Sequence, residues 1–184
     1  MTGPTDARLL LVSGSTRAAS TNTAVLRTVR RLVPPGTVAD LYDGLATLPA
    51  FNPDDEDHPS DPVADLRARI ATADALLFCV PEYAGTLPGS LKNLLDWTVG
   101  GGETYGKPVG WITAAPTGRG LGAEATLATV LGYVGAVPVG PACVRLAVHR
   151  DMIGAGGLVT AATVRAGLTA VAAALVAHRD AART

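Results

Sequence analysis

The sequence predicts an α/β fold in which a doubly wound parallel sheet carries helices on both faces. Short apolar runs rich in Val, Leu and Ile alternate along the chain with segments whose apolar residues recur every three or four positions. The short runs lack an apolar–polar alternation, which is typical of strands that are covered on both faces. Because strands and helices alternate, a parallel sheet with right-handed crossovers is the expected arrangement.

Five strand–helix units follow from this pattern. The apolar runs predict strands at 8–13, 37–42, 75–80, 108–113 and 142–148. The periodic segments, each of which begins at a plausible cap or turn, predict helices at 21–33, 62–72, 87–98, 123–134 and 158–177. The stretch 49–62 is the one long loop, and its DDED run is interpreted as solvated because it lacks the spacing of a calcium loop.

Length and composition indicate one domain and argue against several classes of partner. A chain of 184 residues with 48% apolar residues can bury a continuous core, with 1–7 and 179–184 expected to fray. The net charge of −1 gives nucleic acid no basic surface to bind. The polar start of the chain and the interruption of 158–177 by Arg165 argue against a leader or a membrane span, so we expect a cytoplasmic protein. Cys79 and Cys143 are interpreted as core thiols in a reducing compartment.

The stretch GSTRAASTN, residues 14–22, joins the first strand to the first helix. Such a turn lies at the carboxyl edge of the sheet, where ligands bind, and the helix start offers unpaired N–H groups and partial positive charge. Hydroxyl, amide and guanidinium donors at Ser15, Thr16, Arg17, Ser20, Asn22 and Thr23 suit a phosphate. The simpler alternative is that Ser20 or Thr21 only caps the helix. Neither G-x-x-x-x-G-K-[ST] nor G-x-G-x-x-G is present, so a monophosphate such as that of FMN is favoured over a triphosphate or a dinucleotide.

A second stretch, PEYAGTLPGSLKNLLDW at 81–97, follows the third predicted strand. Together with GSTRAASTN it resembles the NAD(P)H-dependent FMN reductase family of flavodoxin-like proteins, whose members carry G-S-x-R-x-x-S-x-N and P-E-Y-N-x-x-x-P-G-x-L-K-N-x-x-D-W. The resemblance implies a five-stranded sheet of order 2-1-3-4-5 with FMN at its edge. It also implies a homodimer or homotetramer, for which the apolar residues of the third helix are a weak hint: Leu87, Leu91, Leu94, Leu95 and Trp97.

The resemblance also implies which residues meet the flavin. The FMN phosphate would contact Ser15, Arg17, Ser20, Asn22 and Thr23, and the isoalloxazine ring would lie near Pro81, Glu82, Tyr83, Ala84 and Gly85. Tyr83 would either pack on the ring or close an apolar edge of its loop. Position 84 departs from the family pattern, because Ala84 replaces the usual Asn and removes any hydrogen bond that an Asn side chain would make.

A third loop, AAPTGRGLGA at 114–123, follows the fourth predicted strand. Its glycines leave room for a planar ligand, although a flexible connection explains them equally well. The loop is similar to the family's Gly-rich third flavin loop, which implies flavin contacts at Ala115, Pro116, Thr117 and Gly118. Arg119 is either a contact for the phosphate of a nicotinamide cofactor or a solvated arginine.

These patterns predict an FMN-containing oxidoreductase with NADPH or NADH as co-substrate. The three histidines are scattered and no metal or triad motif is present, so the chemistry would take place on FMN with no catalytic side chain. One pocket used in turn by both substrates predicts ping-pong transfer to a flavin, quinone, nitro or azo compound, or a metal oxyanion. Two alternatives remain open: an FMN-binding electron carrier, and a flavoprotein devoted to one biosynthetic step.

Overall fold

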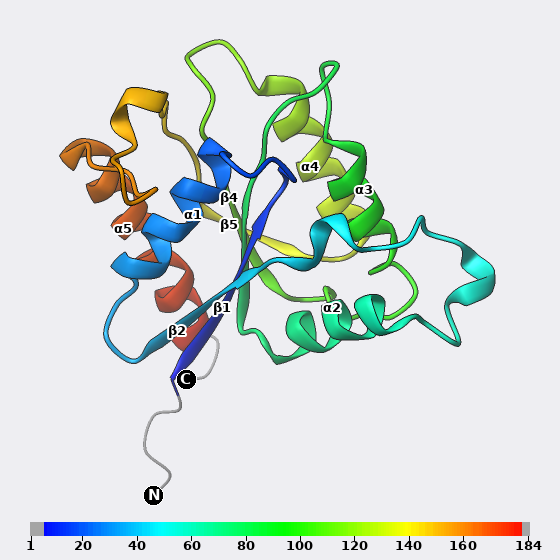
Figure 1. Ribbon diagram of the computed structural model, residues 1–184. Coiled ribbons are helices and arrows are strands. Elements are labelled where there is room, and N and C mark those ends of the chain that lie inside the picture. The colour runs from blue at the N-terminus through cyan, green and yellow to red at the C-terminus, as the bar shows by residue number, and fades with distance from the viewer. Residues whose placement is uncertain (1–5, 182–184) are drawn as a thin grey trace, which may run out of the picture.

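The computed structural model describes residues 6–181 and contains one five-stranded parallel sheet (Figure 1). Its strands are β1 (Ala7–Ser13), β2 (Thr37–Tyr42), β3 (Ala75–Cys79), β4 (Pro108–Thr113) and β5 (Val137–Arg145). They lie in the order β2-β1-β3-β4-β5, and every neighbouring pair is parallel. The predicted flavodoxin-like order is therefore confirmed. The change of direction between β1 and β3 is where such sheets bind ligands.

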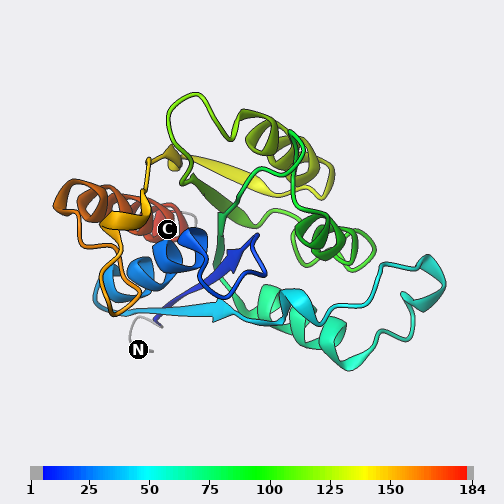
Figure 2. The same ribbon diagram turned by 45° about the horizontal axis from the view of Figure 1, so that its top comes forward.

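Helices cover both faces of the sheet, as predicted (Figures 1 and 2). One face carries α1 (Thr21–Leu32) and α5 (Ala162–Ala181), and the other carries α2 (Asp61–Thr72), α3 (Gly89–Asp96) and α4 (Leu121–Tyr133). Alternate residues of a strand enter opposite cores: Leu10 packs beneath α2 and α3, whereas Leu9 packs beneath α1 and α5. Two buried faces explain why the strands read as continuous apolar runs.

The fifth strand begins earlier than its sequence suggests. It starts at Val137 and ends at Arg145, whereas the predicted strand ran from 142 to 148. Pro138 and Pro141 argue against a strand in the sheet interior, but β5 is an edge strand that pairs only with β4, so one side needs no N–H donors. Because β5 lies at the edge of the sheet, its prolines do not carry the loss of hydrogen bonds that they would cause in an interior strand.

The last helix begins four residues later than predicted and extends four residues further. Residues 158–161 are not helical, because Val159 pairs with Ile153 in an antiparallel bridge and donates its N–H to Thr28 Oγ1 at 2.9 Å. At the other end, residues 179–181 belong to α5, and Ala7 pairs with Thr37 in the sheet. The expected fraying is therefore wrong for Ala7 and for 179–181. Residues 1–5 and 182–184 lie outside the described part of the chain.

The third helix is shorter than predicted, and its motif residues hold the long loop. Pro88 is its N-cap and Trp97 its C-cap. Asn93 accepts the Phe51 N–H at 2.7 Å and donates to the Pro49 carbonyl at 2.8 Å. Trp97 donates to the same carbonyl at 2.9 Å and meets Phe51 edge to face. All five apolar residues offered as a hint of oligomerisation are buried inside the protomer, so that hint is wrong.

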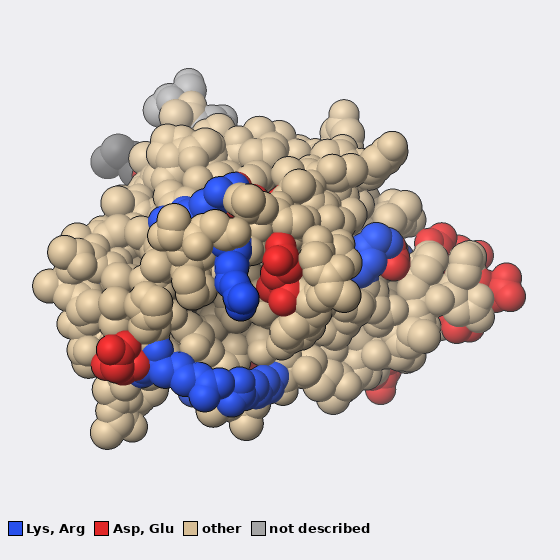
Figure 3. Space-filling model, turned by 90° about the horizontal axis from the view of Figure 1, so that it is seen from above, with Lys and Arg blue, Asp and Glu red and all other residues tan. Residues whose placement is uncertain are grey.

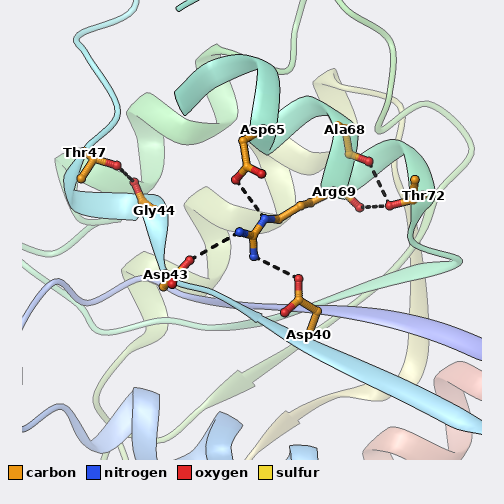
Figure 4. Close-up of polar contacts among 8 residues, drawn as sticks. All are labelled: Asp40, Asp43, Gly44, Thr47, Asp65, Ala68, Arg69 and Thr72. Carbon is orange, nitrogen blue, oxygen red and sulfur yellow. Dashed lines mark hydrogen bonds and ion pairs between the residues drawn. The ribbon is translucent and has the colours of Figure 1, made fainter. Parts of the chain in front are cut away.

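An arginine on α2 ties this helix to the end of β2 (Figure 4). Arg69 Nε lies 2.9 Å from Asp65, its Nη1 3.1 Å from Asp40 and its Nη2 3.7 Å from Asp43. The guanidinium is only partly exposed and meets carboxylates from two elements.

The two cysteines remain free thiols. Cys79 is fully buried at the end of β3, as predicted, whereas Cys143 on β5 is only half-buried against the core. Within residues 6–181 no helix has the length and apolarity needed to cross a membrane.

Candidate functional site

The carboxyl ends of the strands form one hollowed face of the molecule (Figure 3). A pocket of about 460 Å³ opens there. Its walls come from the first turn of α1, from the residues that follow β3 and β4, and from Val148 after β5; its charged lining residues are Glu82 and Arg119. We call this cavity the ring pocket. Its position at the reversal of strand order is the one expected for a ligand site in an open α/β sheet.

The loop between β1 and α1 carries many backbone donors that the protein itself does not use. Gly14 N–H is bonded to Cys79 O, and the N–H groups of Ser15 and Arg17 meet nearby serine hydroxyls. Six further N–H groups find no acceptor within residues 6–181: those of Thr16, Ala18, Ala19, Ser20, Thr21 and Asn22. A cluster of unpaired amides at a helix start suits an anion.

The structure shows the helix cap that the simpler interpretation of Ser20 requires. Ser20 is the N-cap of α1, and its Oγ accepts the Thr23 N–H at 3.3 Å. Thr23 Oγ1 lies 2.9 Å from Ser13 Oγ and so helps to fix the base of the loop. Capping accounts for one donor of the helix start and leaves the six amides above unpaired.

Arg17 lies at the outer rim of this loop, between two small pockets. One, of about 210 Å³, is also lined by Ser15 and Thr23 and by residues that follow β2. The other, of about 270 Å³, is lined by residues 17–21 and by the segment after β5. The exposed guanidinium has no carboxylate within 4.0 Å in the described part of the chain, so its charge is available to a ligand.

Asn22 is held from below by a buried thiol. Cys79 Sγ lies 3.3 Å from Asn22 Oδ1 and donates its proton to it. Burial raises the pKa of the Cys79 thiol, which therefore stays protonated and keeps its role as donor. With the amide oxygen occupied in this way, the Asn22 NH₂ group is left to donate into the ring pocket, which Asn22 lines.

The loop after β3 is a tight hairpin. Tyr83 and Thr86 exchange both backbone hydrogen bonds at 3.1 Å, and the two residues between them, Ala84 and Gly85, have φ values of 50° and 76°. Two positive φ values define a type I′ turn, for which Asn-Gly is the preferred sequence. Ala84 is the only non-glycine residue with positive φ within 6–181. The family's Asn at this position therefore has a backbone role that Ala84 fills poorly.

Glu82 fixes this hairpin to the start of α4. Its Oε2 accepts the N–H groups of Gly122 at 2.8 Å and Ala123 at 3.2 Å, which satisfies two donors of the α4 first turn. The Gly85 carbonyl packs against Gly122 so closely that a Cβ there would collide with it, and Thr86 Oγ1 lies 2.9 Å from Thr126 Oγ1. The carboxylate of Glu82 thus borders the ring pocket but already has its partners.

The loop after β4 is anchored from the opposite side. Glu124, in the first turn of α4, lies 3.2 Å from Thr113 Oγ1 and 2.6 Å from Arg145 Nε on β5. The hydrogen bond from Arg145 lowers the pKa of the Glu124 carboxyl, helped by Thr113 and opposed by partial burial. These bonds fix the helix that follows residues 114–120, so the loop that closes the ring pocket is attached at both ends.

Only some of the predicted residues line the ring pocket. Asn22, Pro81, Glu82, Ala115 and Pro116 do so. Tyr83 is 53% exposed and does not line it, nor do Ala84, Gly85, Thr117 and Gly118, which lie at the exposed tips of the two loops. Ser15, Arg17, Ser20 and Thr23 surround the adjoining pockets.

Sequence reasoning missed five lining residues of the ring pocket, namely Thr21, Val80, Ala114, Gly120 and Val148. Four of them directly flank the motif residues or follow β4, so their place at a strand end was a usable signal. Val148 had no such signal, because the sequence placed it inside the fifth strand instead of after it.

A family model decides the class of the protein. Residues 7–150 match the model of the NADPH-dependent FMN reductases, which covers all three loops described above. The chain belongs to the NADPH-dependent FMN reductase family. FMN and NAD(P)H are thus the cofactor and co-substrate that its family membership assigns.

Named relatives agree with this assignment. The chain is 39% identical over 117 residues to an NAD(P)H-dependent FMN reductase of Pseudomonas aeruginosa, and the match covers 62% of either chain. It is 30% identical over 92 residues to a quinone reductase of Escherichia coli, covering 49% of either chain. The matched segment therefore spans less than two thirds of the length of these curated relatives.

Solved structures extend the similarity to nearly the whole fold. The NAD(P)H:acceptor oxidoreductase FerB of Paracoccus denitrificans superposes with a TM-score of 0.82 at 26% identity, covering 95% of this chain and 98% of that one. A flavodoxin of Pseudomonas aeruginosa gives a TM-score of 0.61 at 19% identity, with 92% and 99% covered, and so shows the fold alone.

In this family member, Ala84→Asn should stabilise the fold. Asn adopts the left-handed conformation more readily than Ala, so we expect the free energy of unfolding to rise by about 0.5–1 kcal/mol. Urea denaturation measures the change. Ala155→Asn, at an exposed loop alanine without positive φ, is the matched control and should change stability little. A loss of stability in Ala84→Asn would contradict the type I′ assignment.

Two glycines of α4 offer a paired test of the hairpin contact. Gly122→Ala places a methyl group against the Gly85 carbonyl and should cost about 1–3 kcal/mol of stability, as overpacking does. Gly132→Ala, on the same helix with nothing within 4 Å of its Cβ position, should instead gain about 0.5–1 kcal/mol. Chemical denaturation of both variants measures the difference. Equal effects would mean that the hairpin does not rest on α4.

Proposed function

We propose that the protein is an FMN-containing oxidoreductase that takes electrons from NAD(P)H and passes them to a second small-molecule acceptor. The observation that carries this proposal is the cluster of unpaired N–H groups at the start of α1, beside Arg17 and the 460 Å³ ring pocket. The relatives' names support quinones, flavins and azo compounds as the acceptor class. Membership of an FMN reductase family supports FMN as the cofactor.

The residues present fit a phosphate ester at this loop. A terminal phosphate accepts several hydrogen bonds, and the six unpaired amides of residues 16–22, the Arg17 guanidinium and the Asn22 NH₂ group supply donors of the required kind. The first turn of α1 adds partial positive charge. Two acidic side chains border these pockets: Glu82 at the ring pocket, whose carboxylate is engaged by α4, and Asp43 at the 210 Å³ pocket, which pairs with Arg69 at 3.7 Å.

The ring pocket suits a planar ring held mainly by backbone. Val80, Ala114 and Val148 provide apolar walls that exclude water from one side of the pocket. Glu82, Ala115 and Gly120 line it, and their N–H groups find no acceptor within residues 6–181, which supports backbone donation to ring nitrogens and carbonyls. When bound, FMN would supply the two-electron chemistry that links a nicotinamide to an acceptor.

This chain's own residues would position the reactants. The backbone donors hold the ring edge, and Asn22 and Thr21 lie where the ring pocket meets the phosphate loop. Because one pocket serves both nicotinamide and acceptor, we propose that they occupy it in turn, which gives ping-pong kinetics. Among the described residues, no cluster of three or more His, Cys, Asp or Glu side chains is placed to bind a metal ion.

Assembly and compartment form part of the same proposal. We propose a homodimer or homotetramer, supported by the large apolar side chains that this protomer leaves exposed, above all Tyr105 at 81% and Tyr133 at 89%. Tyr133 is the last residue of α4, and Tyr105 lies in the loop before β4. Two free thiols support a reducing compartment such as the cytoplasm.

Anaerobic mixing tests the activity itself. The FMN-loaded protein should lose its flavin absorbance within seconds of adding NADPH or NADH, and recover it when a quinone is added. Persistent flavin colour with both nucleotides would reject the reductase and favour the electron carrier. A protein that stays colourless and does not quench FMN fluorescence would reject both.

Arg17→Ala tests the phosphate assignment. Loss of a charge-assisted bond to phosphate should weaken FMN by about tenfold or more, while riboflavin, which lacks the phosphate, should bind the variant and the parent protein equally. Fluorescence titration measures both affinities. Arg8→Ala, an exposed arginine at the opposite end of β1 without a carboxylate partner in the described chain, is the matched control. Equal loss of FMN and riboflavin would contradict the role.

A further inference from the structure

The acidic run at 54–57 lies on a segment that projects from the body of the protein. Figures 1 and 2 show this segment, between β2 and α2, extending away from the sheet. The carboxylates of Asp54, Asp55 and Asp57 are exposed, and none of them forms an ion pair within residues 6–181. We call these three residues the acidic tip. Its negative charge is therefore not neutralised by the described part of the same chain.

The acidic tip is held in a fixed shape by the loop that carries it. Asn52 caps the 3₁₀ helix Pro53–Asp55 by accepting a backbone N–H at 3.2 Å. Just after that helix, the Glu56 carbonyl accepts from Arg67 Nη1 at 3.4 Å. Before it, the Phe51 N–H is bonded to α3 at 2.7 Å. A segment that is already ordered loses little conformational entropy when it docks, which favours a role in binding.

Three arginines of α1 carry the opposite charge on another part of the surface. Arg30 and Arg31 lie three and four positions after Arg27, so the three side chains share one face of the helix. All three are exposed, and together with Gly156 and Leu158 they line a hollow of about 640 Å³. We call these three arginines the arginine face. Like charges at this spacing repel each other, although the dipole at the end of the helix favours the last two.

The arginine face has no carboxylate to neutralise it. None of its guanidinium groups lies within 4.0 Å of a carboxylate oxygen in residues 6–181. Other arginines of this chain are paired: Arg69 meets three carboxylates (Figure 4), and Arg145 meets Glu124. Figure 3 shows basic side chains in a row along one edge of the hollowed surface and acidic side chains on the projection at the other side. Unpaired charges of opposite sign are thus separated across the molecule.

We propose that the acidic tip of one copy docks on the arginine face of a second copy. Three carboxylates then meet three guanidinium groups, and the hollow over α1 gives room for a projecting loop. An isolated surface ion pair stabilises little, but several charges that act as a network stabilise more. When each copy gives its tip and receives the tip of the other, the contact closes as a two-fold dimer.

This contact rests on the proposed homo-oligomer and gives it a defined interface, but it needs no flavin chemistry. It also differs in kind from association through Tyr105 and Tyr133. Salt screens charge pairs at a surface, because the Debye length falls from about 30 Å at 0.01 M to about 3 Å at 1 M. Apolar contacts between tyrosines are not weakened in this way. Salt dependence therefore distinguishes the two kinds of interface.

Sedimentation velocity of the FMN-loaded full chain tests the contact. The parent protein should self-associate in 0.01 M salt, and this association should weaken by at least about tenfold in 1 M salt. At low salt, Arg30→Glu/Arg31→Glu and Asp54→Lys/Asp55→Lys should each weaken it by about tenfold or more. Arg8→Glu, at an exposed arginine near the start of β1, is the control and should leave it unchanged. Parent association that is the same at both salt concentrations would overturn the proposal without any variant.

Mixing the two double variants separates a lost contact from a damaged fold. Each variant alone brings like charges together. The mixture pairs the native tip of one variant with the native face of the other, and the reversed tip with the reversed face. Low-salt association should therefore return in the equimolar mixture. Variants that keep their circular dichroism and FMN content but do not associate on mixing would overturn the contact.

Flavin reduction is a separate measurement, because neither the acidic tip nor Arg30 and Arg31 line the ring pocket or the phosphate loop. In 1 M salt, both double variants should be reduced by NAD(P)H as the parent protein is. Salt-sensitive, charge-reversible association of a protein that neither nucleotide reduces would uphold the contact and reject the reductase. Reduction without such association would reject the contact alone.

Discussion

The carboxyl edge of the sheet depends on one constraint: the loop of residues 14–20 and the first turn of α1 follow β1 with few partners for their backbone N–H groups. Gly14 bonds back to Cys79, Ser20 caps the helix, and Thr23 supports Ser13, yet six amides of residues 16–22 are left over within the described chain. Unpaired amides near a protein surface have to be solvated or bound by an anion. The fold therefore leaves, as a consequence of its topology, a cluster of donors that suits an anion.

The rest of the site is arranged by contacts between loops instead of by side chains that reach the ligand. The hairpin at 83–86 rests on α4 through Glu82, Gly122 and Thr126, and α4 is fixed in turn to β4 and β5 through Glu124. The two loops that border the ring pocket are consequently one mechanical unit. Its geometry depends on residues that a search for catalytic side chains would ignore.

The sequence is sufficient to predict the fold class and, through the family resemblance, the strand order; a pocket also lies at the strand ends where the sequence predicts the site. Four strands were located to within one residue, because their apolar runs are buried on both faces. The errors at β5 and α5 share a cause, since edge pairing tolerates Pro138 and Pro141, and the Thr28–Val159 bond keeps residue 159 extended. Both depend on tertiary neighbours that local patterns do not encode.

Individual roles in the site were harder to predict for a related reason. Glu82 carries a charge next to the ring pocket, but its partners are amides 40 and 41 residues further along the chain. At Ala84 the sequence indicates only a missing side-chain hydrogen bond, and the structure adds a backbone angle that disfavours alanine. A sequence motif indicates which residues could lie near a ligand. Only the packed structure shows whether a polar group already has a hydrogen-bond partner within the protein.

The composition of the pocket wall has a consequence for acceptor choice. In the proposed reductase, Pro81, Ala114, Ala115, Pro116 and Gly120 would offer an incoming acceptor small apolar surfaces and backbone. On this part of the wall, shape and stacking would decide which acceptor enters. A wall of this kind discriminates weakly between planar compounds, because apolar contacts carry little directional information.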